Sequence, residues 1–202
     1  GTPLQYTPYT TPGTETAAFL RRPPERPRIL VTRSTMLGDG PDPMLRSVLR
    51  AAPHVDAEIV IVRPNRAVER ADSLPANVRT VGWTALHEAL PHCTAVVNHG
   101  GAGSVYAALH AGVPQLATPA PGDRRWNAEL VQQRGAGLAA RAGRITAEQL
   151  TALVTDAALA DAARAVSAEI AAMPTVAAAA DRTLALACAS APPNPRSTGT
   201  IP

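Results

Sequence analysis

The chain has 202 residues, enough for one domain of ordinary size with a sizeable hydrophobic core. All 19 basic residues are arginine, the formal net charge is +3, and aromatic residues make up 3% of the chain. The arginines are dispersed among acidic residues, without basic runs, so the composition does not indicate a nucleic-acid partner. No uninterrupted apolar run reaches the roughly 20 residues needed to cross a bilayer, which predicts a cytoplasmic protein without a membrane partner.

The two cysteines, Cys93 and Cys188, stand outside any CxxC or CxxH pattern, in segments rich in Ala and Leu. Such a setting is typical of small buried apolar side chains rather than of metal ligands. We therefore expect no disulfide and no metal site.

Residues 1–27 are rich in Pro and Thr and predict an interdomain linker, so that the ordered core begins at Arg28. Short apolar, β-branched segments follow, and they alternate with helical ones. The expected strands are 28–32, 58–62, 77–81, 94–98, 115–118 and a short one framed by Gly135 and Gly137. The strands over 58–62 and 77–81 are both expected to be buried.

Helices are expected through Met44 to Leu49, over 85–90, from the glycine-rich segment to His110, and over 126–134. The Ala/Leu-rich final third predicts three packed helices, whose N-caps are Thr146, Asp156 and Thr175. A disordered tail is expected over 191–202.

This alternation of strands and helices favours an α/β fold, namely a Rossmann-like, doubly wound parallel sheet over residues 28–190 with a helical C-terminal tail. Ligands of such sheets lie at the carboxyl ends of the strands. The functional residues are therefore expected in four loops, which contain Ser34 and Thr35, Trp83, residues 99–104, and residues 118–123.

The most informative segment is the run Asn98-His-Gly-Gly-Ala-Gly-Ser104, between an expected strand and an apolar helix. Its glycines let the backbone approach a ligand, and the amide N–H groups of Ser104 and its successors would lie unpaired at a helix N-terminus. These amides and the helix dipole favour phosphate, and His99 adds a donor. The segment predicts a nucleotide-type site, although a close strand-to-helix packing turn is the alternative.

Trp83 follows an expected strand, where its indole could stack on a nucleobase or pack in the core. Asp123 could accept hydrogen bonds from sugar hydroxyls, with Arg124 beside it for a phosphate or hydroxyl. The alternative for Asp123 is a helix N-cap.

Sequence motifs of hydrolases and kinases are absent from the chain. A dinucleotide-dependent oxidoreductase remains an alternative, because Gly101-x-Gly103 follows a strand and Asp123 lies about 20 residues later. Tyr106 replaces the third glycine of that fingerprint, however.

In chain order these segments resemble the C-terminal, donor-binding half of inverting GT-B glycosyltransferases. They are most similar to the actinobacterial enzymes that glycosylate macrolides and calicheamicin-type enediynes. The resemblance is carried by residues 27–32, Val81-Gly-Trp83, 95–104, Ala108-Leu-His-Ala-Gly-Val-Pro-Gln115 and Pro121-Gly-Asp-Arg-Arg-Trp-Asn-Ala128.

The resemblance implies transfer of a (deoxy)sugar from a dTDP- or UDP-sugar to a hydrophobic natural-product acceptor, with inversion and without metal or cofactor. It also implies the role of each site residue. Trp83 would stack on the base, Ser34 and Thr35 would contact a phosphate, His99 and the backbone of Gly101, Ala102, Gly103 and Ser104 would bind the diphosphate, and Asp123 and Arg124 would hold the sugar hydroxyls.

The chain departs from the family pattern at Arg124, where the family often has Gln, and at Arg33-Ser34-Thr35, where it has Gly-Thr or Gly-Ser. The segment Tyr6-Thr-Pro-Tyr9 resembles the family's interdomain linker, which implies a separate N-terminal acceptor domain that carries the catalytic histidine. We therefore expect no catalytic residue here and no turnover by this chain alone. A non-catalytic nucleotide-sugar-binding module, or one subunit of a split transferase, is the alternative, and a homodimer is left open.

Overall fold

The computed structural model describes residues 2–8, 15–36 and 40–189, so Tyr9 and the predicted tail over 191–202 lie outside the described residues. Its six parallel strands form one sheet in the order β3-β2-β1-β4-β5-β6. The strands are β1 (Arg28–Thr32), β2 (Glu58–Val62), β3 (Val78–Val81), β4 (Ala95–Asn98), β5 (Gln115–Ala117) and β6 (Gly137–Ala139). The strand order reverses between β1 and β4, as in a doubly wound sheet, which confirms the predicted fold class.

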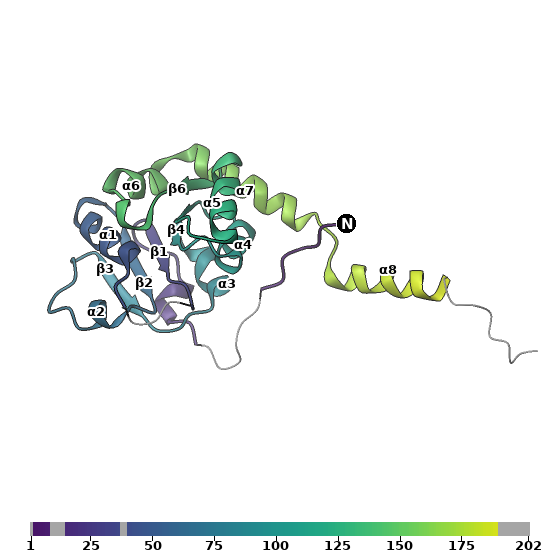
Figure 1. Cartoon of the computed structure of the whole chain (residues 1–202), viewed down its shortest axis with the longest axis horizontal. Coiled ribbons are helices and arrows are strands. Elements are labelled where there is room, and N and C mark those ends of the chain that lie inside the picture. Colours follow the sequence, from purple (N-terminus) through teal and green to yellow (C-terminus); the bar gives the residue numbers. More distant parts are fainter. Residues whose placement is uncertain (1, 9–14, 37–39, 190–202) are drawn as a thin grey trace, which may run out of the picture.

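Helices cover both faces of this sheet (Figure 1). The α-helices are α1 (Pro43–Ala51), α2 (Arg66–Glu69), α3 (Leu86–Ala89), α4 (Ala102–Ala111), α5 (Asp123–Gln133), α6 (Ala147–Thr155), α7 (Ala157–Ala171) and α8 (Val176–Ala189). Short 3-10 helices are η1 (Ala18–Arg21), η2 (Ala52–His54), η3 (Leu90–His92) and η4 (Ala142–Arg144).

Alternation along β1 divides the core into two clusters, because successive side chains of a strand point to opposite faces. Ile29 and Val31 pack in one cluster with apolar residues of α1 and α6. Leu30 packs in the other, with residues of α3 and α4. The sheet is thereby buried between two helical layers.

The starts of α6, α7 and α8 follow the predicted N-caps, and α4 ends at a glycine. Gly112 adopts a left-handed conformation, with φ of 67°, and ends α4. Thr146 and Gln149 form a capping box at the start of α6, and Asp156 caps α7. Thr175 accepts a hydrogen bond from the Ala178 N–H at the start of α8 (3.1 Å).

β3 differs from the expectation of a buried strand. Val78 is buried, but Arg79 and Thr80 are exposed. The reason is the strand's position at the edge of the sheet, where it pairs with β2 alone.

The core includes residues that precede Arg28, contrary to the expected start. Leu20 of η1 is fully buried in the cluster that contains Leu30. Thr16 is also buried, and its Oγ1 accepts a hydrogen bond from the Ala85 N–H (3.3 Å). Part of the predicted linker therefore packs on the domain, and the boundary of the linker stays a prediction.

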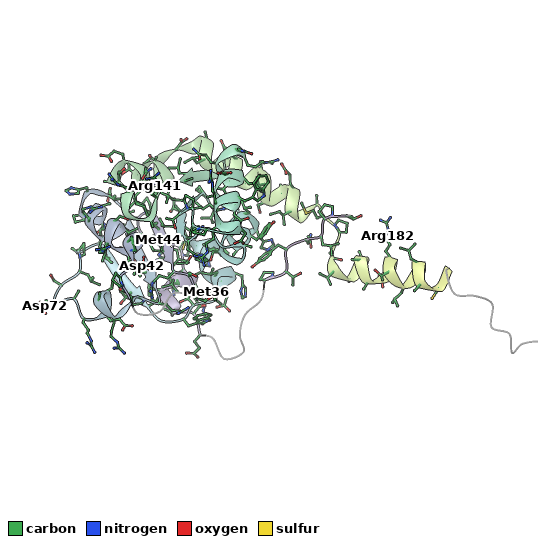
Figure 2. All side chains as sticks on the ribbon, viewed as in Figure 1. Met36, Asp42, Met44, Asp72, Arg141 and Arg182 are labelled. Atoms are coloured by element: carbon green, nitrogen blue, oxygen red, sulfur yellow. The ribbon has the colours of Figure 1, made fainter. Side chains whose placement is uncertain are left out.

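α8 differs from the prediction of three packed helices. It extends away from the domain, with Arg182 projecting from it (Figures 1 and 2). Its residues Leu184 and Leu186 are 64% and 62% exposed. α6 and α7 do pack, through buried residues such as Leu150 and Ala163. Composition predicts the helix of α8 but not a surface against which it packs.

By length and hydropathy alone, the segment Ala157–Cys188 could cross a membrane, although charged residues such as Asp161 and Arg164 interrupt it. This is weak evidence for insertion, because the segment consists of α7 and α8 with Pro174 between them, and α7 packs on α4. The absence of a membrane partner stays a prediction.

Both cysteines are free. Cys93 is partly buried, and burial raises the pKa of its thiol to about 12, so it is protonated at neutral pH. Cys188 is exposed on α8, so the expectation of a buried side chain is wrong there.

Replacing Leu20 with Ala tests whether this part of the predicted linker belongs to the core. We expect Leu20→Ala to lower the free energy of unfolding by about 2–5 kcal/mol, because it removes fully buried methyl groups and leaves a cavity. Urea denaturation measures the change. The matched control, Leu186→Ala on the exposed α8, should change it by less than about 0.5 kcal/mol. Equal effects of the two substitutions would contradict the packing described here.

Candidate functional site

One cavity of about 680 Å³ lies at the carboxyl edge of the sheet. It is lined from the loops after β1, β2, β3 and β4 and from the start of α5. The structure brings all of the predicted site residues to this cavity. They are Ser34, Thr35, Trp83, His99, Gly101, Ala102, Gly103, Ser104, Asp123 and Arg124.

The glycine turn after β4 is fixed from below by the buried side chain of Asn98. Its Nδ2 donates to Gln115 Oε1 (2.7 Å), and its Oδ1 accepts from the Gly100 N–H (2.8 Å). Gly100 has a φ of +77°, and a Cβ there would lie 2.9 Å from the Arg124 carbonyl oxygen. A larger residue would therefore strain both this turn and the start of α5. Asn127 of α5 closes the turn from the side by donating to the Gly100 carbonyl oxygen (3.0 Å).

The ring of His99 lies directly over Gly101. A Cβ on Gly101 would lie 2.2 Å from His99 Cε1, so only glycine leaves room for this ring. The Gly101 N–H donates to His99 Nδ1 (3.2 Å), which assigns the proton of the neutral ring to Nε2. Nε2 lies 3.5 Å from Ser104 Oγ at the cavity wall.

His99 is neutral at pH 7. Burial, together with the positive charge of Arg124, lowers the pKa of its imidazole below the ordinary value. The ring therefore offers the Nε2–H as a hydrogen-bond donor without a full positive charge.

The first turn of α4, residues 102–104, lines the cavity. The prediction that Ser104 donates an unpaired amide is wrong, because its N–H donates to the Gly101 carbonyl oxygen (3.1 Å). The amides of Ala102 and Gly103 precede the intrahelical bonds and are the ones available to a ligand. A Cβ on Gly103 would meet no atom within 4 Å, so the space beside it is open.

Ser34 and Arg124 meet across the cavity. Arg124 Nη2 donates to Ser34 Oγ (3.1 Å), while Thr35 is exposed at the rim.

Asp123 is exposed and is the first residue of α5, which begins earlier than predicted. Its N-cap is Gly122, so the alternative role of Asp123 as the N-cap is wrong.

Trp83 does not pack in the core, because it is 48% exposed at the cavity. The guanidinium of Arg63 lies over its ring, with Cζ 4.8 Å from the ring centroid. Sequence reasoning missed Arg63, since the loop after β2 carries no glycine. The only signal for Arg63 is the rule that ligands of such sheets lie at the carboxyl ends of the strands, because β2 ends at the same edge of the sheet as β1 and β3.

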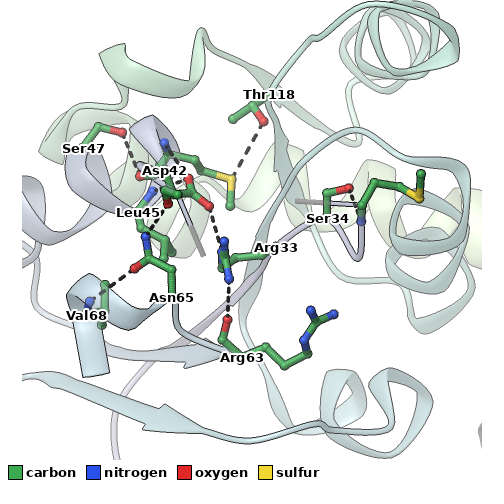
Figure 3. Close-up of polar contacts among 12 residues, drawn as sticks. Arg33, Ser34, Asp42, Leu45, Ser47, Arg63, Asn65, Val68 and Thr118 are labelled. Carbon is green, nitrogen blue, oxygen red and sulfur yellow. Dashed lines mark hydrogen bonds and ion pairs between the residues drawn. The ribbon is translucent and has the colours of Figure 1, made fainter. Parts of the chain in front are cut away.

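A buried ion pair supports this side of the cavity, and it was also missed (Figure 3). Arg33 Nε donates to Asp42 Oδ2 (2.8 Å), and both side chains are 3% exposed. Asp42 Oδ1 also accepts the Met44 and Leu45 N–H groups and so caps α1. Arg33 Nη1 donates to the Arg63 carbonyl oxygen (3.2 Å).

The N-terminal segment closes another side of the cavity through Tyr6, Thr7 and Pro8. The Tyr6 ring stacks on Tyr106 of α4, with centroids 6.3 Å apart. Gln5 Nε2 donates to the Ala171 carbonyl oxygen at the end of α7 (2.6 Å). No sequence pattern predicts this contact, because it joins residues 166 positions apart.

Among residues 2–8, 15–36 and 40–189, no three His, Cys, Asp or Glu side chains lie together as a metal site would require. The expected absence of metal and cofactor stays a prediction.

A parallel sheet with a cavity at the point where its strand order reverses defines the class of doubly wound, ligand-binding α/β domains. Residues 46–186 match the family described as "Erythromycin biosynthesis protein CIII-like, C-terminal domain". Over 157 residues, the chain is 45% identical to elloramycin glycosyltransferase ElmGT of Streptomyces olivaceus. The match covers 76% of this chain and 40% of that protein.

Solved glycosyltransferase structures share the fold. SnogD from Streptomyces nogalater matches with a TM-score of 0.75 and 36% identity, over 92% of this chain and 49% of that one. VinC, solved in complex with dTDP, matches with a TM-score of 0.79 and 30% identity, over 92% of this chain and 47% of VinC.

The chain therefore belongs to the EryCIII-like C-terminal domain family of actinobacterial natural-product glycosyltransferases, whose structures are of the GT-B type. It spans less than half the length of these relatives. The family is one of glycosyltransferases, which decides against the dinucleotide oxidoreductase.

The lowered pKa of His99 predicts a specific titration. We expect the His99 ring protons, followed by NMR, to titrate with a midpoint below that of free histidine, and Arg124→Met to move the midpoint upward because it removes a nearby positive charge. Between the lowered pKa of folded His99 and its ordinary pKa, the unfolded chain binds more protons than the folded chain. His99 therefore lowers the free energy of unfolding as the pH falls through this range. A midpoint at or above the ordinary value would contradict the described burial.

Proposed function

We propose that this chain is the donor-binding part of an inverting glycosyltransferase, which takes a (deoxy)sugar from dTDP or UDP and passes it to a hydrophobic natural-product acceptor. The observation that supports this most strongly is the convergence of donors on one cavity. The amides of Ala102 and Gly103, the His99 Nε2–H and the Arg124 guanidinium all lie there. The relative VinC was solved with dTDP, which agrees with a dTDP-type ligand.

The diphosphate would bind at the start of α4. A helix N-terminus combines unpaired amides with the positive end of the helix dipole, and both favour anions. His99 would donate its Nε2–H to a phosphate oxygen, and the Ser34 hydroxyl, beside Arg124, would hold the other side. Thr35 at the rim is the remaining candidate for a phosphate contact.

The base and the sugar would lie at opposite ends of this diphosphate. Trp83 exposes nearly half of its surface at one end, where a base can stack on the indole. Asp123 is exposed at the other, beside Arg124, where its carboxylate can accept hydrogen bonds from sugar hydroxyls. Its Oδ2 already accepts from Asn127 Nδ2 (3.3 Å), which orients the carboxylate.

In the proposed reaction, an acceptor hydroxyl attacks the anomeric carbon as the bond from that carbon to the diphosphate oxygen breaks. Negative charge then grows on the leaving diphosphate, and the amides of α4 and its dipole would stabilise that charge more than they stabilise the bound donor. The acceptor proton would pass to a base outside this chain. We expect that base to be the histidine of an N-terminal acceptor domain, so the chain alone would bind donor without transferring sugar.

The alternatives of a non-catalytic binding module and a split-transferase subunit keep the same donor site. A binding module would have no acceptor domain, whereas a split transferase would carry its acceptor domain on a separate polypeptide.

Removing the imidazole tests the diphosphate role. We expect wild type to bind dTDP in titration calorimetry, and His99→Ala to weaken that binding about 10-fold or more, because a hydrogen bond to a charged group contributes about 1.5–3 kcal/mol. His54→Ala, at an exposed histidine outside this cavity, is the matched control and should bind like wild type. Equal affinities of wild type and His99→Ala would rule out the assigned role.

Adding one methyl group at Gly103 tests where the diphosphate lies. We expect Gly103→Ala to keep or raise the melting temperature, because its Cβ meets open space and Ala favours a helix, yet to abolish dTDP binding by filling the path to the amides. Calorimetry and thermal unfolding measure the two effects separately.

Gly143→Ala serves as the control, since its Cβ would make an ordinary 3.7 Å contact with Pro43 away from the cavity. It should bind dTDP like wild type. Unchanged binding in Gly103→Ala would place the diphosphate elsewhere.

A further inference from the structure

Arg63 lines the cavity beside Trp83. Its Cζ lies 4.8 Å from the centroid of the Trp83 ring, and both residues line the cavity. Among the ion pairs of the described residues, none includes Arg63. Among the described residues, its guanidinium contacts the face of the Trp83 indole, and its N–H donors are not taken up by an ion pair and can serve a ligand.

The backbone holds Arg63 in this place. It is the one non-glycine residue of the described chain with a positive φ, 51°. Its N–H donates to the Val81 carbonyl oxygen (2.9 Å), and its own carbonyl oxygen accepts from Arg33 Nη1 (3.2 Å). Because Arg33 is fixed by Asp42 in a buried pair, the unfavourable conformation is over-determined by its surroundings.

This arrangement sets which bases suit the site. A guanidinium has donors in its plane and no acceptor, so beside a stacked base it favours ring carbonyl oxygens and disfavours amino groups. Thymine and uracil each carry two ring carbonyl oxygens, cytosine carries one, and adenine carries none. The adenine and cytosine rings also present an amino group to the same donors.

We propose that Arg63 selects the base of the donor nucleotide by donating hydrogen bonds to ring carbonyl oxygens of a thymine or uracil held beside Trp83. This inference rests on the proposed donor site. The buried Arg33–Asp42 pair positions Arg63 through the bond of Arg33 to the Arg63 carbonyl oxygen.

The test compares dTDP, dCDP and dADP, which share deoxyribose and diphosphate, for binding to the 202-residue chain by calorimetry and by competition. In Arg63→Met, which keeps apolar contact with the indole, we expect the affinity for dTDP to fall about 10- to 100-fold. The loss for dCDP should be smaller, and the loss for dADP less than about threefold. Arg63→Lys, which keeps the charge but not the planar fork, should also lose preference for dTDP.

Thermal unfolding of each variant checks that the fold is kept. The matched control is Arg70→Met, at an exposed arginine directly after α2 and outside the cavity. An equal loss for all three nucleotides in Arg63→Met would overturn the inference, because it would place Arg63 on the diphosphate. Unchanged dTDP binding would overturn it as well. If the wild-type chain binds none of the three nucleotides, the proposed donor site fails. If the wild-type chain binds dTDP and the Arg63 variants keep the same preference among the nucleotides, only the role of Arg63 is overturned.

Discussion

The side chain of Asn98 joins the end of β4 to β5 and to the glycine turn, through its bonds to Gln115 Oε1 and to the Gly100 N–H. Both Asn98 and Gln115 are fully buried, so a missing partner would leave a buried polar group unsatisfied, at about 1–3 kcal/mol. This one carboxamide sets the direction in which the chain leaves the sheet. The placement of His99 over Gly101, and the aim of α4 at the cavity, both follow from that direction.

The charges around the cavity are arranged in two ways. Arg33 and Asp42 neutralise each other in the interior, where they act as a rigid support. Arg63 and Arg124 instead keep their charges at the cavity, one beside Trp83 and the other beside Ser34. His99, whose pKa is lowered, lies between an amide turn and Arg124 and supplies a neutral donor. An anion would therefore meet fixed positive groups and aligned dipoles, with little reorganisation on binding.

The sheet could be predicted from the sequence because its strands are short β-branched segments between Gly, Pro and capping residues, and the glycine turn because its residue types have a direct conformational meaning. Arg63 could not be found in this way, since a positive φ at arginine is imposed by the tertiary bonds to Val81 and Arg33. The burial of Leu20 was hidden for a similar reason, because its Pro-rich surroundings say nothing about the sheet face on which it packs.

The contact between Gln5 and Ala171 spans 166 residues, and with the stacking of Tyr6 on Tyr106 it completes one wall of the cavity. The N-terminal segment is thus held against the domain from α4 and α7 together, although both helices lie far from it in sequence. A change that displaces either helix would therefore also alter the shape of the cavity, even where it leaves the sheet and the glycine turn intact.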